Sequence, residues 1–320
     1  MMRSPADGPL ISVIIPARNE GRRLHTAVAS IITGRSPGLP LQIVVVDDAS
    51  SDDSCAELSR WYSWARDHVK IDVIRLPRWS GIPYARNFGA QFARADILFI
   101  TDANVRFQPY WDCPIWEHIA PDRVLCATIA DADSSFRGFG CTLHLPSMSA
   151  MWLKSPRGYG GYVPIAPCAA TIIPADLFRR TGGYDTSMPI YGAAEPEFSV
   201  RLWLGGAEIV ALPNLVLEHR FRPASERHAF LEPLQFVQVH NYLRFGLLYL
   251  DQSQVAQMLQ HYATAVPQVF EKAVRRVWSS DVWNRRDLLQ RRMPLKFDFF
   301  VRRFNIRDAA GQLAVRQREA

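Results

Sequence analysis

The sequence predicts an α/β fold with a parallel sheet, because strand and helix patterns alternate four times between residues 11 and 102. Short apolar runs at 11–15, 41–46, 71–76 and 97–100 predict the strands. Three of these runs end in polar or acidic residues. An open α/β sheet binds its ligands at the carboxyl ends of its strands, so the fold class also predicts where a site would lie.

The segments between these strands have helical spacing. The first run is expected to stop at Pro16, and a helix is expected from Asn19 or Glu20 to about Ile32. Ser51 can cap a second helix, which would place Cys55, Leu58 and Trp61 on one face. A third helix is expected from Pro83 to Ala93, because proline fits the first turn of a helix.

The pattern is mixed beyond residue 111. Strands are predicted at 124–129, 139–145, 169–173, 209–212 and 215–217, and helices at 175–180 and 195–204. Residues 148–167 are rich in glycine, proline and aromatics, which predicts a long functional loop. After about residue 222 the chain is helical, with predicted helices at 230–250, at 255–277 and from Pro294 onward.

Composition limits the classes of protein. The chain has 320 residues, 48% of them hydrophobic, so it can bury a sizeable core. The net charge of +6 suits an anionic ligand such as a nucleotide. Helix-turn-helix, RRM and OB patterns are not visible, so nucleic acid is not an expected partner.

The five scattered cysteines contain no CxxC pair and fit a reducing cytosol. Neither a signal peptide nor an apolar run of about 18 residues is visible, so we expect a cytoplasmic protein.

Polar clusters follow the first, second and fourth predicted strands. They are Pro16 to Glu20, Asp47-Asp48, and Asp102-Ala103-Asn104. The ends of these strands can meet at one crevice. A carboxylate there can accept a hydrogen bond from a base or ribose, and another can bind a cation. Together they describe a site for a nucleotide diphosphate.

These residues carry a resemblance to a known family. The stretches Ile14 to Glu20, Val46 to Asp52, Gly81 to Ala90 and Phe99 to Asp102 resemble the opening of family 2 glycosyltransferases of the GT-A fold. A second group of motifs is similar to the catalytic domain of polypeptide N-acetylgalactosaminyltransferases: Gly182 to Asp185, Tyr191-Gly192, Glu197 to Trp203, and His219 to Arg222. The resemblance covers roughly residues 10 to 225.

The resemblance implies a fold and a division of the chain. The fold would be a GT-A, Rossmann-like α/β nucleotide-diphospho-sugar transferase fold with a C-terminal helical extension. Residues 1–225 would be the catalytic domain and residues 226–320 the extension. The activity would be sugar transfer from a nucleotide sugar, expected to be a UDP-sugar, to a glycan, peptide or small-molecule acceptor.

The resemblance also implies the residues of the donor site. The nucleotide would be lined by Pro16, Ala17 and Glu20, with Asp48 on the uracil and Arg86 near the diphosphate. Asp102 would begin a metal motif of the DxD type. Arg222, with residues 223–228, would close over the diphosphate or would link two domains.

The metal motif departs from the pattern, because its second acidic residue is Asn104. An amide oxygen still coordinates a hard cation, but without charge. His219 matches a third ligand, so the implied set for Mn²⁺ or Mg²⁺ is Asp102, Asn104 and His219. Two alternatives stay open. The cation site is weak or absent, and His219 is a buried histidine that bonds to the backbone and not to a metal.

The implied catalytic base lies at the start of the helix at 195–204. Glu195 is at the position of the base and Glu197 at a later acidic position, both beside Pro196. A carboxylate base fits an inverting displacement. The alternative is that Glu195 and Glu197 only complement a helix N-terminus. Inversion and retention stay open, because the two resembling families differ in outcome.

Two further alternatives concern the whole protein. Asn104 and Ala194 favour a degenerate transferase fold that binds a nucleotide or acts as a scaffold without turnover. In the C-terminal extension, Phe297, Phe300, Val301 and Phe304 are spaced to share one helical face. That face is expected to pack on the core; the alternatives are a peripheral membrane contact or a homo-oligomer contact.

Overall fold

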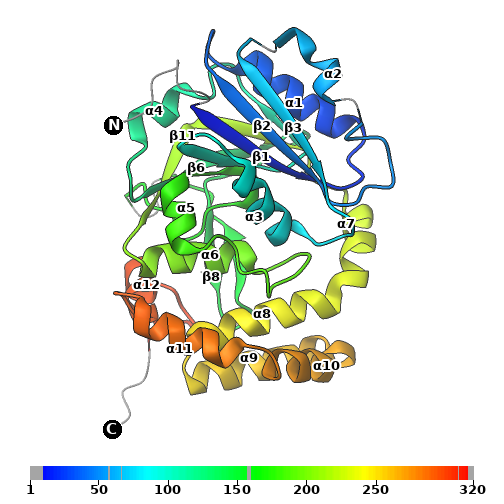
Figure 1. Ribbon diagram of the computed structural model, residues 1–320. Helices are drawn as coiled ribbons and strands as arrows, with labels where there is room; N and C mark the ends of the chain where they lie inside the picture. Colours follow the sequence, from blue (N-terminus) through cyan, green and yellow to red (C-terminus); the bar gives the residue numbers. More distant parts are fainter. Residues whose placement is uncertain (1–9, 57, 66, 157–159, 309, 316–320) are drawn as a thin grey trace.

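A computed structural model describes residues 10–56, 58–65, 67–156, 160–308 and 310–315. Within these ranges, nine strands form one twisted sheet in the order β3-β2-β1-β4-β10-β6-β11-β5, with β7 paired to β6 (Figure 1). A separate hairpin pairs β8 with β9. The α/β fold class predicted from the sequence is confirmed. The N-terminal residues 1–9, on which the absence of a signal peptide was judged, lie outside the described ranges.

The strands are β1 (Ile11–Ala17), β2 (Leu41–Asp47), β3 (Val69–Arg75), β4 (Ile97–Ile100), β5 (Val105–Phe107), β6 (Arg123–Asp131), β7 (Arg137–Gly138), β8 (Cys141–His144), β9 (Ser149–Trp152), β10 (Thr171–Pro174) and β11 (Glu208–His219). The main helices before the extension are α1 (Arg22–Gly34), α2 (Leu58–Trp61), α3 (Ile82–Phe92), α4 (Cys113–His118), α5 (Ala175–Thr181) and α6 (Ala194–Leu204). The C-terminal helices are α7 (Ala224–Leu231), α8 (Gln235–Tyr249), α9 (Gln252–Ala265), α10 (Pro267–Trp278), α11 (Val282–Arg292) and α12 (Phe297–Phe304).

The central strands are buried on both faces. In β1, Val13 and Ile15 join the core that α1 covers, whereas Ile14 joins the core of α5 and α6. In β2, Val45 faces α1 and Val44 packs with Ala85 of α3. Since successive side chains of a strand point to opposite faces, a strand covered by helices on both sides must be apolar throughout. This explains why the runs at 11–15 and 41–46 do not alternate.

The start of the chain differs from the sequence prediction in two places. β1 continues through Pro16 to Ala17 because its pairing with β4 ends at Ile14, so the missing N–H of Pro16 costs no bond to that neighbour. α1 begins only at Arg22, since Asn19 and Gly21 have φ angles of 54° and 51°, which no helix accommodates.

The helix that Ser51 was expected to cap is mostly absent. The Ser51 amide instead donates to Asn19 Oδ1 at 2.7 Å, which ties the loop after β2 to the loop after β1. Residues 51–56 form turns, and α2 is a single turn at Leu58–Trp61. Local hydrogen bonding by asparagine and serine competes with helix formation.

Further differences lie in the second half. The predicted loop at 148–167 contains β9, which pairs with β8. The strands predicted at 209–212 and 215–217 form one strand, β11, with a bulge between Leu212 and Val216. The helix predicted at 255–277 is broken at Pro267 into α9 and α10. α12 begins at Phe297, not at Pro294, because the Leu295 amide donates to the Leu204 carbonyl at 3.1 Å.

Helices α8 to α12 form a layer below the sheet domain in Figure 1, whereas α7 lies beside the sheet domain. α8 contributes Leu243, Phe245 and Leu247 to the same buried core as Phe198 of α6. The predicted helical extension is therefore confirmed, and it shares a core with the sheet domain. The boundary at residues 225/226 stays a prediction.

We predict that Phe300→Ala lowers the free energy of unfolding by about 3–5 kcal/mol, since Phe300 is fully buried in that shared core. Its neighbour Phe299 is only partly buried, so Phe299→Ala is a matched control with an expected cost of about 1 kcal/mol. Urea unfolding of both variants measures the difference. Equal losses would show that α12 does not pack on the core as described.

Candidate active site

The polar clusters after the strands meet at one edge of the sheet. β1, β2 and β4 are parallel neighbours, and β11 runs parallel to β6. β10 is antiparallel to both β4 and β6, so the carboxyl ends of β4 and β11 point the same way. Asp48, Asp102 and His219, at or just beyond these ends, therefore lie at one edge.

Strand register brings Asn104 to His219. β5 follows Asn104 directly and is antiparallel to β11, with Val105 paired to His219. The Arg220 amide donates to the Asn104 carbonyl at 3.2 Å, and Asn104 Nδ2 donates to the Arg220 carbonyl at 3.2 Å. Two residues separated by more than a hundred positions in the chain are thereby held together by a backbone ladder.

A buried arginine links the two central carboxylates. Arg86 of α3 is fully buried, and it donates to Glu195 Oε1 at 2.6 Å and to Asp102 Oδ1 at 2.8 Å. It also donates to the Cys168 carbonyl at 3.3 Å and lies over the Tyr184 ring. Burial alone would lower the pKa of Arg86, but Tyr184, Glu195 and Asp102 outweigh it and raise the pKa, so the guanidinium stays charged.

This placement corrects the expected role of Arg86. With no exposed surface and both terminal nitrogens engaged, Arg86 does not reach a diphosphate in this arrangement. It instead fixes the positions of Asp102 and Glu195, whose side chains remain 20% and 18% exposed.

The two candidate base residues have different environments. Glu195 lies in the first turn of α6 and is partly exposed. Glu197 has no exposed surface, and its oxygens accept hydrogen bonds from Arg201 at 2.9 and 2.8 Å and from the Tyr249 hydroxyl at 2.8 Å. Its full burial and these three bonds favour a structural role for Glu197 over the predicted catalytic one.

The implied metal ligands suit one divalent cation. His219 Nε2 lies 3.9 Å from Asp102 Oδ2, a span that one cation bridges when each ligand is about 2 Å away. Burial lowers the pKa of His219, although Asp102 and Asp131 oppose it, which favours the neutral ring that a metal ligand requires. Among the described residues no group of three or more His, Cys, Asp or Glu side chains could hold a metal ion, and Asn104 as a third ligand stays a prediction.

Asp48 organises a loop beside the site. Its oxygens accept the backbone amides of Ser80 at 2.7 Å and Gly81 at 2.8 Å. Gly81 has a φ of +88°, and a Cβ there would lie 2.1 Å from the Ile190 backbone, so only glycine fits. Burial raises the pKa of Asp48, although the two amides oppose it. Contact of Asp48 with a uracil ring stays a prediction.

The remaining residues predicted to bind the nucleotide are Pro16 and Ala17 in β1, Glu20 just after it, and Arg222. Ala17 is buried and its carbonyl accepts the Asp48 amide at 2.8 Å, so it joins two strand ends and presents no side chain to a ligand. Pro16 is half-buried in β1. Glu20 lies 3.6 Å from Arg222, burial raises its pKa, and its Oε2 is buried without a hydrogen bond. The structure thus brings Glu20 and Arg222 together.

Helix α8 of the C-terminal extension contacts the segment that leads into α6. Asn241 Nδ2 donates to the carbonyls of Pro189 at 2.9 Å and Tyr191 at 3.0 Å. Arg244 donates to Asp185 Oδ2 at 2.9 Å. These contacts hold residues 185–192, which lead into α6. Helix α8 therefore fixes where α6 begins, and with it the position of Glu195.

Several of these residues had no role in the sequence prediction. Arg18 donates to the Asp48 carbonyl at 2.7 Å and lies over the Trp79 ring, which is 41% exposed. Arg18 and Tyr184 stand inside the motifs that carried the resemblance, which is the one signal that could have indicated them. Nothing local indicates Asn241, whose partners are about fifty residues away.

Comparisons with known proteins agree with this architecture. Residues 12–160 match the family model described as glycosyl transferase family 2. The chain is 27% identical over 290 residues to human polypeptide N-acetylgalactosaminyltransferase 16, covering 84% of this chain and 49% of that protein. It is 29% identical over 269 residues to N-acetylgalactosaminyltransferase 6 of Drosophila melanogaster, covering 76% and 39%. The chain thus spans about half, or less, of the length of these curated relatives.

Solved structures share the fold. A crystal structure of GalNAc-T7 with UDP, GalNAc and Mn²⁺ superposes with a TM-score of 0.72 at 19% identity, covering 92% of this chain and 56% of that one. The mannosyltransferase PcManGT from Pyrobaculum calidifontis, in complex with GDP-Man and Mn²⁺, gives 0.57 at 17% identity, covering 90% and 86%. The fold is therefore of the GT-A type, as the resemblance implied.

We predict that Arg86→Met lowers the free energy of unfolding by about 3–5 kcal/mol, because it leaves two neighbouring carboxylates without their shared cation. Arg179→Met breaks an ion pair with Asp176 that is exposed on both sides, and we expect it to cost at most about 1 kcal/mol. Chemical denaturation of both variants tests this. A small loss for Arg86→Met would contradict its role in holding Asp102 and Glu195.

Proposed function

We propose that this chain, which carries a glycosyltransferase family 2 domain of the GT-A fold, is an enzyme that transfers a sugar from a nucleotide-sugar donor to an acceptor hydroxyl. The single observation that supports this best is the Arg86 cluster at the strand ends. It presents two ordered carboxylates, Asp102 and Glu195, next to the imidazole of His219.

The donor we propose is a UDP-sugar. The similarity to polypeptide N-acetylgalactosaminyltransferases and the motif that ends in Asp48 support it. Asp48 and the loop at Ser80 and Gly81 would receive the base, and the exposed ring of Trp79 offers a stacking surface beside them. Glu20 and Arg222 would border the ribose and diphosphate.

The cation we propose is Mn²⁺ or Mg²⁺, held by Asp102, Asn104 and His219. When bound, it would neutralise the charge that develops on the leaving diphosphate. Asp102 would bind the cation through Oδ2, which lies 3.9 Å from His219 Nε2 and accepts only a 3.5 Å hydrogen bond from the Cys168 thiol, because Arg86 engages Oδ1. The single carboxylate in this set predicts a weak site, since ligand charge tunes cation affinity.

For the chemical step we propose inversion with Glu195 as the base. Glu195 would take the proton of the acceptor hydroxyl as that oxygen bonds to the anomeric carbon and the bond to the diphosphate breaks. Arg86 holds Glu195 Oε1 and orients the carboxylate. Retention, with Glu195 as an electrostatic group only, is the alternative.

A second candidate function is nucleotide binding without turnover. Asn104, which removes one charge from the metal set, and Ala194, which precedes Glu195, favour it. Titration of UDP with and without Mn²⁺, followed by an assay for donor hydrolysis, separates the two. Metal-dependent UDP binding without any turnover over a panel of donors would support the second candidate.

The acceptor and the location of the protein are part of the same proposal. A glycan, a peptide or a small molecule remain the acceptor classes, and we propose a cytoplasmic protein. None of the helices among the described residues combines the length and apolar character of a membrane span.

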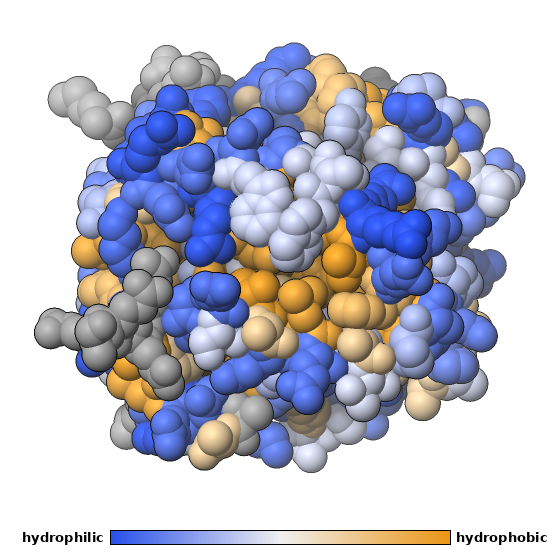
Figure 2. Space-filling model, turned by 90° about the horizontal axis from the view of Figure 1, so that it is seen from below, coloured by the Kyte–Doolittle hydropathy of each residue, from blue (hydrophilic) through white to orange (hydrophobic). Residues whose placement is uncertain are grey.

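Figure 2 shows apolar residues gathered on the face of the C-terminal helices. Trp278 at the end of α10 and Trp283 in α11 are 44% and 39% exposed, and their ring centroids lie 5.1 Å apart, which supports a peripheral membrane or homo-oligomer contact.

We predict that Mn²⁺ strengthens UDP binding and that Asp102→Ala and His219→Ala each abolish the gain. Asn104→Asp should tighten the cation by restoring a charged ligand. Calorimetric titration of UDP with Mn²⁺ or with EDTA measures this. If EDTA leaves the UDP affinity of the wild type unchanged, the cation is not part of the site.

We predict that Glu195→Gln reduces turnover by about two to four orders of magnitude, the usual share of a general base. UDP affinity should stay nearly constant, because the substitution keeps the size and one hydrogen-bond acceptor. Initial rates with the best donor of a panel test this. Unchanged rates would exclude Glu195 as the base and favour retention.

A further inference from the structure

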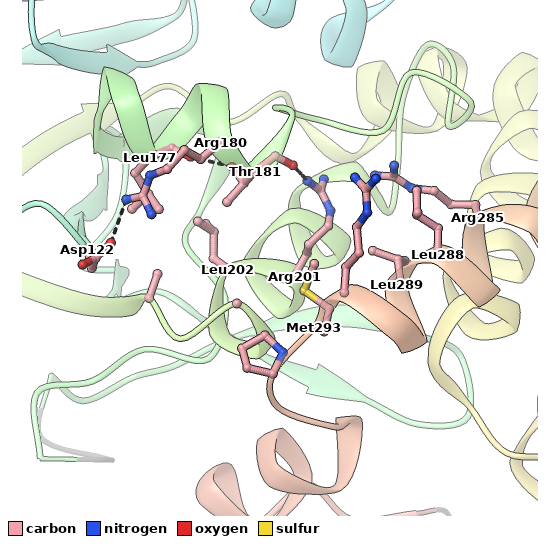
Figure 3. A pocket seen from close by; sticks show the side chains of 14 residues that line it. Asp122, Leu177, Arg180, Thr181, Arg201, Leu202, Arg285, Leu288, Leu289 and Met293 are labelled. Atoms are coloured by element: carbon pink, nitrogen blue, oxygen red, sulfur yellow. Dashed lines mark hydrogen bonds and ion pairs between the residues drawn. The ribbon is translucent and has the colours of Figure 1, made fainter.

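A cavity of about 300 Å³ lies between α5, α6 and α11, away from the strand ends that carry the proposed donor site (Figure 3). Its lining is unusually rich in arginine: Arg180, Arg201, Arg285 and Arg292. The single acidic residue of the lining is Asp122. Leu177, Leu202, Leu288, Leu289 and Met293 supply apolar walls.

Two of the four arginines are committed to the fold. Arg180 pairs with Asp122 at 2.7 Å, at one end of the cavity. Arg201 is buried against Glu197 and donates to the carbonyls of Thr181 and Gly183. Their charges are therefore largely compensated.

The other two arginines are uncompensated. Among the described residues, no carboxylate lies within ion-pair distance of Arg285 or Arg292, and no group accepts a hydrogen bond from the buried Nε of Arg285. The pKa of Asp185 is lowered: burial opposes the shift, Arg244 contributes most to it, and Arg285 contributes less. The Asp185 carboxylate forms its ion pair with Arg244. Figure 3 shows the guanidinium groups of Arg201 and Arg285 turned toward the same end of the cavity.

We propose that this cavity binds a phosphate monoester. Guanidinium groups match phosphate oxygens in geometry, and a monoester carries a charge of about −1.5 to −2 at pH 7, which offsets two free arginines. The apolar walls suit the organic part of such an ester. The cavity is about the smallest size usual for small-ligand pockets, at roughly 300 Å³, which favours a small head group.

Two sources share this chemistry, a soluble phosphate ester and a phospholipid head group. Titration with glycerol 3-phosphate tests the first, and co-sedimentation with phosphatidic acid vesicles, against phosphatidylcholine vesicles, tests the second. The test variant is Arg285→Gln with Arg292→Gln. The control is Arg275→Gln with Arg291→Gln, which removes the same charge from exposed positions of α10 and α11 outside the cavity.

We expect at least one probe to bind the wild type and the control equally, and the test variant to bind it at least about tenfold more weakly. Binding should persist when UDP is saturating. The proposal is overturned if neither probe binds, if test and control variants lose affinity equally, or if UDP displaces the probe. UDP affinity should be the same in all three proteins, so failure here leaves the proposed function untouched.

Discussion

The structure of the candidate site depends on one buried guanidinium. Arg86 has no exposed surface, yet it carries a charge that Asp102 and Glu195 must balance. A buried charge is costly unless it is paired and hydrogen-bonded, so the two carboxylates cannot move apart without a large penalty. The start of α6 is thereby locked to α3 and to the end of β4, although Glu195 lies 109 residues after Arg86 in the chain.

The same constraint explains why the C-terminal helices matter to the site. Glu195 can meet Arg86 only if α6 begins at the right place, and the segment that leads into α6 is held by Asn241 and Arg244 of α8. Tyr249 of α8 also donates a hydrogen bond to Glu197 in the first turn of α6. The extension is thus a structural support for the site, which agrees with its share in the common core.

The arginine-lined cavity extends this view of α6. Arg201 and Glu197 form a buried pair on this helix, so α6 faces the donor site with its first turn and the cavity with its last. The two ends are separated by roughly 9 Å along the helix axis, at about 1.5 Å for each residue between Glu195 and Arg201. A ligand in the cavity would contact the element that carries the proposed base.

The sequence by itself determined the parallel strands β1 to β4, most other strand positions and the polar residues at strand ends, because apolar runs and their terminators are local signals. It also indicated Asp102, Asn104 and His219 through their motifs. It did not indicate that β5, β7 and β10 are antiparallel, which makes the sheet mixed. Only the tertiary structure decided that Arg86 is buried between two carboxylates, that the Tyr249 hydroxyl binds Glu197, and that α8 supports α6. Burial and pairing depend on residues far apart in the chain, and local patterns carry no information about which distant partner a charged side chain will meet.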